Sequence, residues 1–216
     1  MISVNYRNTK VVMSVVLLLC ALTVKADDWK EASQAVETST QAMIGLLEEG
    51  RQEAARKSEI AGETVPLNEL ELLLGMEVIL GPVVDFRSIA KGVMARFYRQ
   101  ASTQQVEDFH LAFKYSLLNT YSRAVVAFKI NNFEIQSNPY SSDKPGRQKI
   151  WVKVYSSGAA YDINYAMKKG QQGWKVTNVT LDGINLGLAF RQQFASAMVQ
   201  NKGSMDEVIA LWNDPS

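Results

Sequence analysis

The spacing of apolar residues changes once along this chain, and that change restricts its fold more than any other feature. From Ser102 to Phe128, apolar residues recur every three or four positions, which places them on one face of a long helix. From Phe133 to Asp182 they alternate in short segments separated by turn residues, as in antiparallel strands with short connections. This order predicts the α+β class, with helices packed on a twisted antiparallel sheet of about four strands.

Three further helices are predicted before the long one. An amphipathic helix is expected at 27–50, and the charged stretch 51–64 reads as a helix end followed by a loop. A second apolar helix at 67–80 is stopped by Gly81-Pro82. A third is expected at about 85–100, with Asp85 as its N-cap.

Capping patterns mark the starts of the remaining helices. Ser102 and Gln105 form a capping box for the long helix. Asn185 can cap a helix that follows the last strand, and Ser204 with Glu207 forms a second capping box for a short final helix. Along the sequence, helices therefore precede the sheet, at 27–130, and follow it, at 185–216. The sheet itself is expected at 133–182.

The last predicted strand contains an irregularity. Trp174 and Val176 alternate in one phase, whereas Val179 and Leu181 alternate in the other. The phase slips at Asn178, and such a slip predicts a β-bulge, in which one extra residue is inserted into a strand.

Residues 1–26 are predicted to be a cleaved signal peptide. Two basic residues precede the 14-residue apolar run 11–24, and small residues end at Ala26, the predicted cleavage point. The run is too short to span a bilayer comfortably, so we expect an exported protein that does not itself span the membrane. Cys20 suggests a lipoprotein cleavage site as an alternative, but the residue before it is Leu19 where a small residue is preferred.

The expected mature chain, 27–216, is long enough for one sizeable domain. Without the three basic leader residues it has 20 basic and 22 acidic residues, a net charge of −2. This balance gives no electrostatic reason to expect nucleic acid as a partner. The mature chain would also lack cysteine, so its stability would come from packing rather than from disulfides.

The residues needed for common catalytic sites are missing from the sequence. His110 is the only histidine, and it lies within the apolar face of the long helix with Glu107 one turn earlier. With no second histidine and no mature cysteine, histidine-based zinc motifs, Ser-His-Asp triads and Cys-His pairs are incomplete. We therefore expect His110 to be a packed, hydrogen-bonded residue, no metal site, and no enzyme.

Two blocks of sequence resemble one known family. The segments VVDFRSIAKGVMARFYRQASTQQVEDFHLAFKYSLLNTYSRAV, at 83–125, and INYAMKKGQQGWKVTNVTLDGINLGLAFRQQF, at 163–194, resemble the MlaC family, also called toluene-tolerance proteins. The family usually has glycine where this chain has Ala95 and aspartate where it has Asn178. Members are periplasmic phospholipid-binding components of a lipid-transport system in Gram-negative bacteria.

The resemblance implies a periplasmic carrier that shuttles phospholipid between outer- and inner-membrane complexes and maintains outer-membrane lipid asymmetry. Its expected partners are an inner-membrane ABC transporter complex and an outer-membrane lipoprotein-porin complex, and its cargo is the bound phospholipid, with no other cofactor. The apolar stripes of the helices and sheet supply the residues that we predict to line its cavity: Phe86, Ile89, Val93, Met94, Phe97, Phe109, Phe113, Leu117, Tyr121, Val152, Ile163, Tyr165, Met167, Val176, Phe190, Phe194 and Met198.

Arg191 stands alone as a charge in the apolar helix after the last strand, and two roles are open for it. It can pair with Asp182 or with a helix carbonyl at the corner between sheet and helix. It can instead contact the lipid phosphate at the mouth of the cavity, because a guanidinium binds phosphate in a bidentate manner.

Two other classes of function also remain open from the sequence. A small enzyme would need a polar dyad in the pocket, for which His110 is the only candidate. A periplasmic chaperone or adaptor would bind protein segments without lipid cargo.

Overall fold

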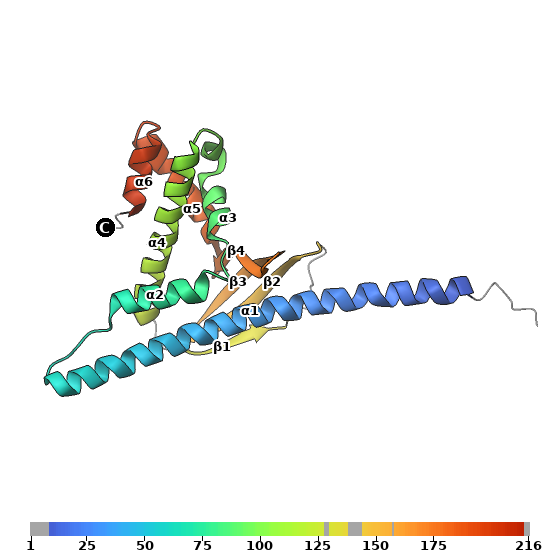
Figure 1. Ribbon diagram of the computed structural model, residues 1–216, viewed down its shortest axis with the longest axis horizontal. Coiled ribbons are helices and arrows are strands. Elements are labelled where there is room, and N and C mark those ends of the chain that lie inside the picture. Colours follow the sequence, from blue (N-terminus) through green and yellow to red (C-terminus); the bar gives the residue numbers. More distant parts are fainter. Residues whose placement is uncertain (1–8, 128–129, 138–143, 157, 214–216) are drawn as a thin grey trace, which may run out of the picture.

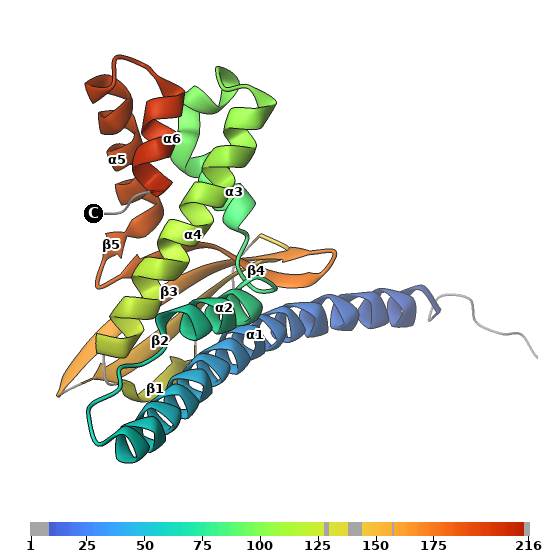
Figure 2. The ribbon, with the colours of Figure 1, turned by 60° about the vertical axis from the view of Figure 1, so that its left-hand side comes forward.

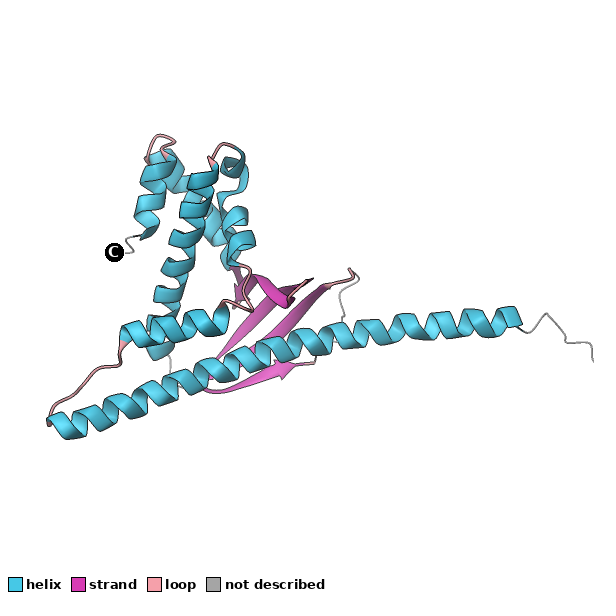
Figure 3. Ribbon diagram, viewed as in Figure 1, coloured by secondary structure: helices cyan, strands magenta, loops and turns pink. Residues whose placement is uncertain are grey.

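The computed structural model describes residues 9–127, 130–137, 144–156 and 158–213, with the side chains of 9–27, 124–125, 127 and 131 left out. Six α-helices, a 3₁₀ helix and five strands lie in this described part (Figures 1 and 3). Their order is α1 (Thr9–Ala61), α2 (Glu69–Leu80), α3 (Phe86–Met94), η1 (Ala95–Arg99), α4 (Thr103–Ala127), β1 (Ile130–Gln136), β2 (Arg147–Ser156), β3 (Ala159–Gly170), β4 (Gly173–Leu181), β5 (Ile184–Asn185), α5 (Leu186–Gln200) and α6 (Met205–Asn213).

The strands form one antiparallel sheet in the order β1-β2-β3-β4-β5. Helix α1 packs along the sheet, α2 lies between α1 and α4, and helices α3 to α6 stand together as a bundle at one side of the sheet (Figures 1 and 2). The α+β class predicted from the sequence is therefore confirmed. The sheet has one strand more than predicted, because a two-residue β5 follows the four long strands.

Strand β5 exists because Asp182-Gly183 forms a tight hairpin turn. Both residues have positive φ, 46° and 82°, and Leu181 pairs directly with Ile184 across them. Positive φ at both central residues is the type I′ geometry that matches the twist of a hairpin, and Asp-Gly is a preferred pair for it. The chain thus reverses through β5 before it enters α5, rather than passing straight from β4 into the helix.

The bulge predicted near Asn178 is present in β4, one residue earlier. Met167 pairs with Val176 and Ala166 pairs with Asn178, so Thr177 is the extra residue. The Thr177 hydroxyl donates a 3.1 Å hydrogen bond to the carbonyl oxygen of Ala166 and so satisfies an acceptor of β3. Before the bulge one alternate set of β4 side chains faces the helices, and after the bulge the other set does.

Several helix starts follow the predicted caps. Asp85 and Asn185 each accept a 3.0 Å hydrogen bond from the backbone N–H three residues further on. The Ser102 and Gln105 capping box is complete, with backbone-to-side-chain distances of 3.0 and 3.1 Å in the two directions. Asn68, which was not predicted, caps α2 through its side-chain oxygen.

Helix α1 is longer than predicted. The stretch 51–61, expected to fray into a loop, continues the helix, and Glu53 pairs with Arg56 and Lys57 along it at 2.8 and 3.4 Å. Charged side chains three and four positions apart stabilise a helix that has little apolar surface to bury. The helix also runs unbroken through residue 26, and the cleavage point there stays a prediction. No helix in the described ranges is both long and apolar enough to cross a membrane.

Polar contacts fasten α1 to the hairpin between β3 and β4. The Lys169 ammonium lies 3.1 Å from Asp28 and 2.7 Å from Glu31. Glu31 also accepts a 3.1 Å hydrogen bond from the indole N–H of Trp174, a buried residue of β4. These contacts fix the register of α1 against the sheet at one end.

Helix α3 ends earlier than predicted. It stops at Met94, and Ala95 adopts φ 50° and ψ −118°, after which the chain continues as the 3₁₀ helix η1. Ala95 has the backbone conformation that glycine adopts at no steric cost, and the resemblance described above leads us to expect glycine at this position. The predicted helix to Gln100 is therefore wrong from residue 95 onward.

Three clusters of buried apolar residues hold the fold together. In the helical bundle Phe109, Phe113 and Phe194 are almost fully buried, and Phe109 meets Phe194 edge to face with ring centroids 4.7 Å apart. In the second core, Ala32 and Val36 of α1 pack against the sheet. The third cluster contains Met76 of α2, Phe86 of α3 and Leu118 of α4, and these three residues also line the candidate site.

Candidate functional site: an apolar cavity between the helices and the sheet

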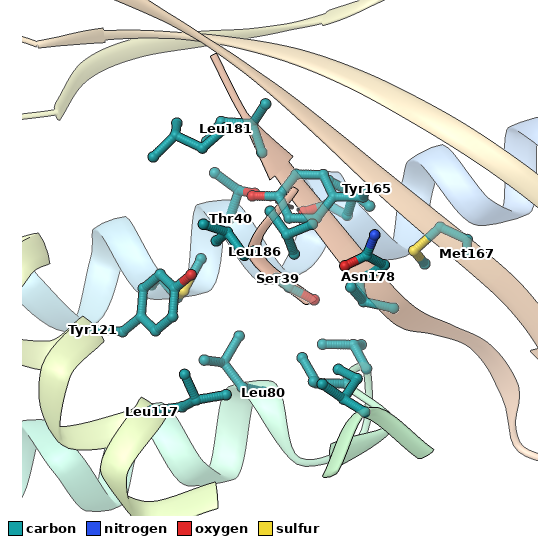
Figure 4. Close-up of a pocket in the computed structure, with 18 of the residues that line it drawn as sticks. Ser39, Thr40, Leu80, Leu117, Tyr121, Tyr165, Met167, Asn178, Leu181 and Leu186 are labelled. Atoms are coloured by element: carbon teal, nitrogen blue, oxygen red, sulfur yellow. Dashed lines mark hydrogen bonds between the residues drawn. The ribbon is translucent and has the colours of Figure 1, made fainter. Parts of the chain in front are cut away.

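A cavity of about 400 Å³ separates the sheet from the helices. This volume lies within the range of about 300–1,000 Å³ that is typical of small-ligand sites. Figure 4 shows side chains from α1, α2, α4, the sheet and the start of α5 converging on the space. Its described lining consists of Ala35, Val36, Ser39, Thr40, Met43, Met76, Leu80, Val83, Val84, Phe86, Ile89, Leu117, Leu118, Tyr121, Ile130, Val154, Tyr161, Ile163, Tyr165, Met167, Val176, Asn178, Val179, Leu181, Asp182, Leu186, Gly187 and Phe190.

Helix α1 forms one wall of the cavity. Val36, Thr40 and Met43 are spaced by four and three residues, so they lie on the same face of the helix. Ser39 and Thr40 also line the cavity, but their hydroxyls donate to the carbonyl oxygens four residues earlier, at 2.7 and 2.8 Å. Because these hydroxyls are already bonded to the helix, the wall offers mainly carbon to a ligand.

The sheet forms the opposite wall. Ile163, Tyr165 and Met167 alternate along β3 and point into the cavity. On β4, Val176 faces the cavity before the bulge, and Val179 faces it after the bulge. Because of the bulge, Val179 and Leu181 face the cavity. With an unbroken alternation from Val176, these two side chains would face away from it.

Asn178 and Asn185 secure the corner where the sheet meets α5. The Asn178 amide donates to the side-chain oxygen of Asn185 at 3.0 Å and accepts from the backbone N–H of Gly187 at 3.1 Å. A Cβ at Gly187 would lie 2.5 Å from the Asn178 oxygen, so only glycine fits there without movement. This network leaves Asn178 little capacity for a ligand, although it lines the cavity.

Among the described lining residues, Asp182 is the only charged one. Its carboxylate accepts a 2.8 Å hydrogen bond from the backbone N–H of Asp162, which closes the end of the sheet. Lysine or arginine side chains would be expected in a pocket built around a phosphate. The described lining has none, and the cavity is suited to an uncharged, apolar ligand portion.

Three tyrosines, Tyr121, Tyr161 and Tyr165, interrupt the apolar surface. Tyr165 projects from the middle of β3 and Tyr121 from the last turns of α4 (Figure 4). Burial raises the pKa of Tyr165 to about 12, and the nearby phenol of Tyr121 adds to the effect. Burial likewise raises the pKa of Tyr121, so both hydroxyls stay protonated at neutral pH.

The structure places nine of the predicted lining residues on the cavity wall, from helices and strands alike. They are Phe86, Ile89, Leu117, Tyr121, Ile163, Tyr165, Met167, Val176 and Phe190. Their contact with a lipid stays a prediction.

The other eight predicted residues lie in packed cores rather than on the cavity wall. The indole of Trp212 on α6 fills the space beside Phe109 and Phe113, with ring centroids 5.2 and 5.9 Å away. An apolar stripe on a helix identifies the face that turns inward, but not whether a neighbouring side chain fills the space in front of it. The bundle core contains Val93, Met94, Phe97, Phe109, Phe113, Phe194 and Met198, and the sheet core contains Val152.

Arg191 lies away from the cavity. Its side chain is exposed, and its Nε donates a 3.0 Å hydrogen bond to the carbonyl oxygen of Gly92 near the end of α3. Of the two structural partners considered, the helix carbonyl is the one it uses, and Asp182 instead bonds within the sheet. Arg191 thus ties α5 to α3 rather than locking the corner between the sheet and α5.

None of the described lining residues from α1 and α2 was predicted. Val36 and Met43 belong to the amphipathic stripe of 27–50, but nothing in the sequence places that stripe against the sheet. Leu80 and Met76 come from a helix so uniformly apolar that its inward face cannot be distinguished from its outward one. Leu70, Leu74 and Val78 of the same helix are in fact exposed. The sequence therefore indicated which face of α1 turns inward, but it did not indicate the inward face of α2.

His110 lies outside the cavity lining, as a partly buried residue of α4. Its Nδ1 is 3.4 Å from a carboxylate oxygen of Glu107, and its side chain is 15% exposed. It therefore occupies the packed and paired position predicted for it. No group of three possible metal ligands occurs in the described ranges.

An apolar cavity on an α+β scaffold, with one engaged carboxylate and no cation in its described lining, is typical of a binding protein for an apolar ligand. Comparison with protein families is consistent with that class. The chain belongs to the MlaC family, whose model, described as MlaC protein, matches residues 68–214.

Two individual proteins are similar to it. The toluene tolerance protein ttg2D of Pseudomonas putida is 38% identical over 136 residues, and the matched region spans 62% of each chain. The solved structure of the phospholipid-binding protein from Ralstonia solanacearum, in complex with a phospholipid, superposes with a TM-score of 0.70 at 19% identity. That match covers 85% of this chain and 99% of the other, and at this identity it shows a shared fold.

Proposed function

We propose that this protein is a non-catalytic phospholipid carrier of the periplasm. It would take up phospholipid at one membrane complex and release it at another, an outer-membrane lipoprotein-porin complex and an inner-membrane ABC transporter complex being the two partners. The observation that supports the proposal is the apolar cavity of about 400 Å³ between α1, α4 and the sheet. Membership of the MlaC family and the phospholipid bound by the structural relative agree with it.

The free energy of acyl-chain burial explains why such a carrier is needed. Each methylene removed from water contributes about 0.8 kcal/mol. Exposing two tails of roughly 16 carbons to water therefore costs on the order of 20 kcal/mol. A membrane and an apolar cavity bury those methylenes about equally well. Net transfer between them is then close to neutral, and the carrier lowers the kinetic barrier rather than changing the equilibrium.

The charge distribution of the cavity favours an orientation with the headgroup outward. Moving a phosphate into the lining would place it near the Asp182 carboxylate without a compensating cation from a described lining residue. The acyl chains, by contrast, meet Val36, Met43 and Leu117. The lipid would therefore insert its tails and leave its phosphate in water, and headgroup identity would have little effect on affinity.

Native cargo tests the proposal directly. The full chain, with residues 1–26 included, would be expressed in a Gram-negative host and purified from the periplasmic fraction without detergent. Organic extraction and mass spectrometry should then yield diacyl phospholipid in stoichiometric amount, with the N-terminus of the purified protein at Asp27. Protein recovered without lipid, and unable to take up labelled phospholipid from vesicles, would exclude the carrier. Bound peptide in its place would indicate a chaperone or adaptor.

Transfer between membranes is tested separately. Donor vesicles with fluorescent phospholipid and acceptor vesicles without it are mixed with catalytic amounts of the protein, and transfer should accelerate in proportion to protein concentration. Binding without accelerated transfer would show a lipid-storing protein that needs its membrane partners for release.

A further inference from the structure

Tyr121 and Tyr165 carry the free polar groups of the cavity. No described residue forms a hydrogen bond with either hydroxyl, although both side chains line the cavity. In Figure 4 the Tyr165 hydroxyl points along the cavity toward the side where Tyr121 lies. Because neither hydroxyl has a protein partner, both are available to an acceptor that a ligand brings into this apolar site.

Other polar groups of the lining differ from this pair because they are already engaged. Ser39 and Thr40 bond to carbonyls of their own helix, and Asn178 bonds to Asn185 and Gly187. Asp182 accepts from the backbone of Asp162 in β3, and Tyr161 has an interaction with another residue. The phenols of Tyr121 and Tyr165, which have no such partner, are thus free to orient a ligand by hydrogen bonding.

The protonation state of these phenols defines the acceptor they suit. Since burial holds the pKa of Tyr165 at about 12 and raises that of Tyr121, both remain O–H donors throughout the physiological range. A neutral donor in an apolar site favours a neutral acceptor, because a charged one would bring its own desolvation cost. Carbonyl oxygens are neutral acceptors with two lone pairs each.

A phospholipid carries such acceptors where its tails begin. The ester carbonyls join each acyl chain to glycerol, so they enter with the tails, whereas the phosphate lies further out. Tyr121 and Asp182 are the two exposed residues of the described lining, and the others are buried or half-buried. Tyr121 therefore lies toward the open side, and Tyr165 lies next to it in the interior.

We propose that the hydroxyls of Tyr121 and Tyr165 bind the ester carbonyls of the inserted lipid and so fix how deep the acyl chains enter. This inference rests on the proposed phospholipid-binding function and adds a selectivity to it. The protein should prefer acyl lipids, whose chains are joined by esters, to alkyl lipids, whose chains are joined by ethers. An ether oxygen lacks the carbonyl acceptor but leaves the tails and the phosphate unchanged.

The test is a competition between two lipids in one membrane. Vesicles with equal amounts of diester and diether phosphatidylcholine of the same chain length are incubated with the delipidated protein, which is then separated and extracted. Mass spectrometry gives the ratio of the two bound lipids. One neutral hydrogen bond changes an equilibrium by roughly two- to tenfold, so the unsubstituted protein should favour the diester by a factor in this range or above it.

Phenylalanine variants assign that preference to the tyrosines. Tyr121→Phe and Tyr165→Phe should each reduce the ratio, and the double variant should bring it close to one while still binding both lipids. Tyr155→Phe is the matched control, because the Tyr155 hydroxyl bonds to Glu134 on the sheet at 3.3 Å, away from the cavity lining. That variant should keep the preference of the unsubstituted protein.

Each outcome separates this inference from the proposed function. A protein that binds both lipids in equal amount, or a double phenylalanine variant that keeps the preference, overturns the role of the tyrosines and leaves lipid binding intact. Failure of the unsubstituted protein to bind either lipid overturns the proposed function itself. A preference that disappears only in the double variant would show that one hydroxyl is sufficient to bind the carbonyl.

Discussion

The guanidinium of Arg191 holds the last turn of α3, because its Nε donates a 3.0 Å hydrogen bond to the carbonyl oxygen of Gly92. That carbonyl is one of the four at the end of a helix that lack a partner within the helix. A cation at this end also interacts favourably with the helix dipole. The contact joins two helices of the bundle that are separated by 99 residues in the sequence.

Replacing this arginine should affect stability and leave lipid binding unchanged. Arg191→Met keeps the aliphatic stem but removes the donor and the charge, so the free energy of unfolding should fall by about 1 kcal/mol. Urea denaturation measures this change, and lipid extraction measures cargo. Gln193→Met, on an exposed position of the same helix, is the control. A large loss of cargo with unchanged stability would instead indicate a headgroup contact.

Ala95 occupies a backbone conformation that suits glycine better. With φ 50° and ψ −118°, its Cβ is strained, and such residues cost about 1–3 kcal/mol. Ala95→Gly should therefore raise the free energy of unfolding by about 1 kcal/mol, once the greater entropy of unfolded glycine is subtracted. The same substitution at Ala55, an exposed helical position of α1, should lower it by a similar amount. Equal destabilisation at both sites would mean that residue 95 is not strained.

Because of the ion pair between Glu77 and Lys114, the free energy of unfolding should decrease at acid pH. The hydrogen bond from the Lys114 ammonium, the largest effect, holds the pKa of Glu77 below its usual value of about 4.3. The pair thus stabilises the fold above about pH 4.3, and that contribution is lost as the pH falls through the lower folded-state pKa. Glu77→Gln should reduce stability at pH 7 by up to about 1 kcal/mol.

Denaturation curves recorded between pH 7 and pH 3 test this prediction. The difference between Glu77→Gln and the unsubstituted protein should shrink toward the acid end. Glu69→Gln, whose carboxylate faces Arg123 at 3.6 Å with both side chains well exposed, should show little difference at any pH. A constant difference for Glu77→Gln across the range would contradict the assignment.

Filling the cavity should separate binding from stability. Ala35 lines the cavity, so Ala35→Trp would project an indole from α1 into the existing space and bury apolar surface there. Co-purified lipid should fall at least severalfold, while the melting temperature stays equal or rises. Ala55→Trp places the same side chain on an exposed part of α1 and should retain its cargo. Full lipid occupancy in the Ala35 variant would place the lipid elsewhere.

Local features of the fold could be predicted from the sequence because local interactions determine them. The caps at Asp85, Ser102 and Asn185, and the bulge beside Asn178, each depend on residues a few positions apart. The end of α3 at Ala95 could not be predicted in this way, since alanine is a good helix former and a tertiary arrangement overrides its propensity. The departure from the family's glycine was the one signal of it.

The hollow part of the site could not be predicted from periodicity. Phe113 and Leu117 are neighbours on the same face of α4, yet Phe113 is packed against Trp212 and Leu117 lines the cavity. The difference arises because α6, more than 90 residues further along, covers one half of the stripe and leaves the other half open. Such information lies in the arrangement of distant elements and not in the spacing along one helix.

The contacts that fasten α1 to the sheet also have a consequence for how the chain is made. Asp28 and Lys169 are separated by 141 residues, and Glu31 and Trp174 by 143. A ribosome releases the apolar face of α1 long before it has synthesised β3 and β4, so that face has no partner for most of translation. Long-range closure of this kind is slow and leaves apolar surface open to aggregation. In a nascent chain that stops before β4, the apolar face of α1 would lack the strand that covers it in the folded protein. A holding chaperone during synthesis and export would protect that face.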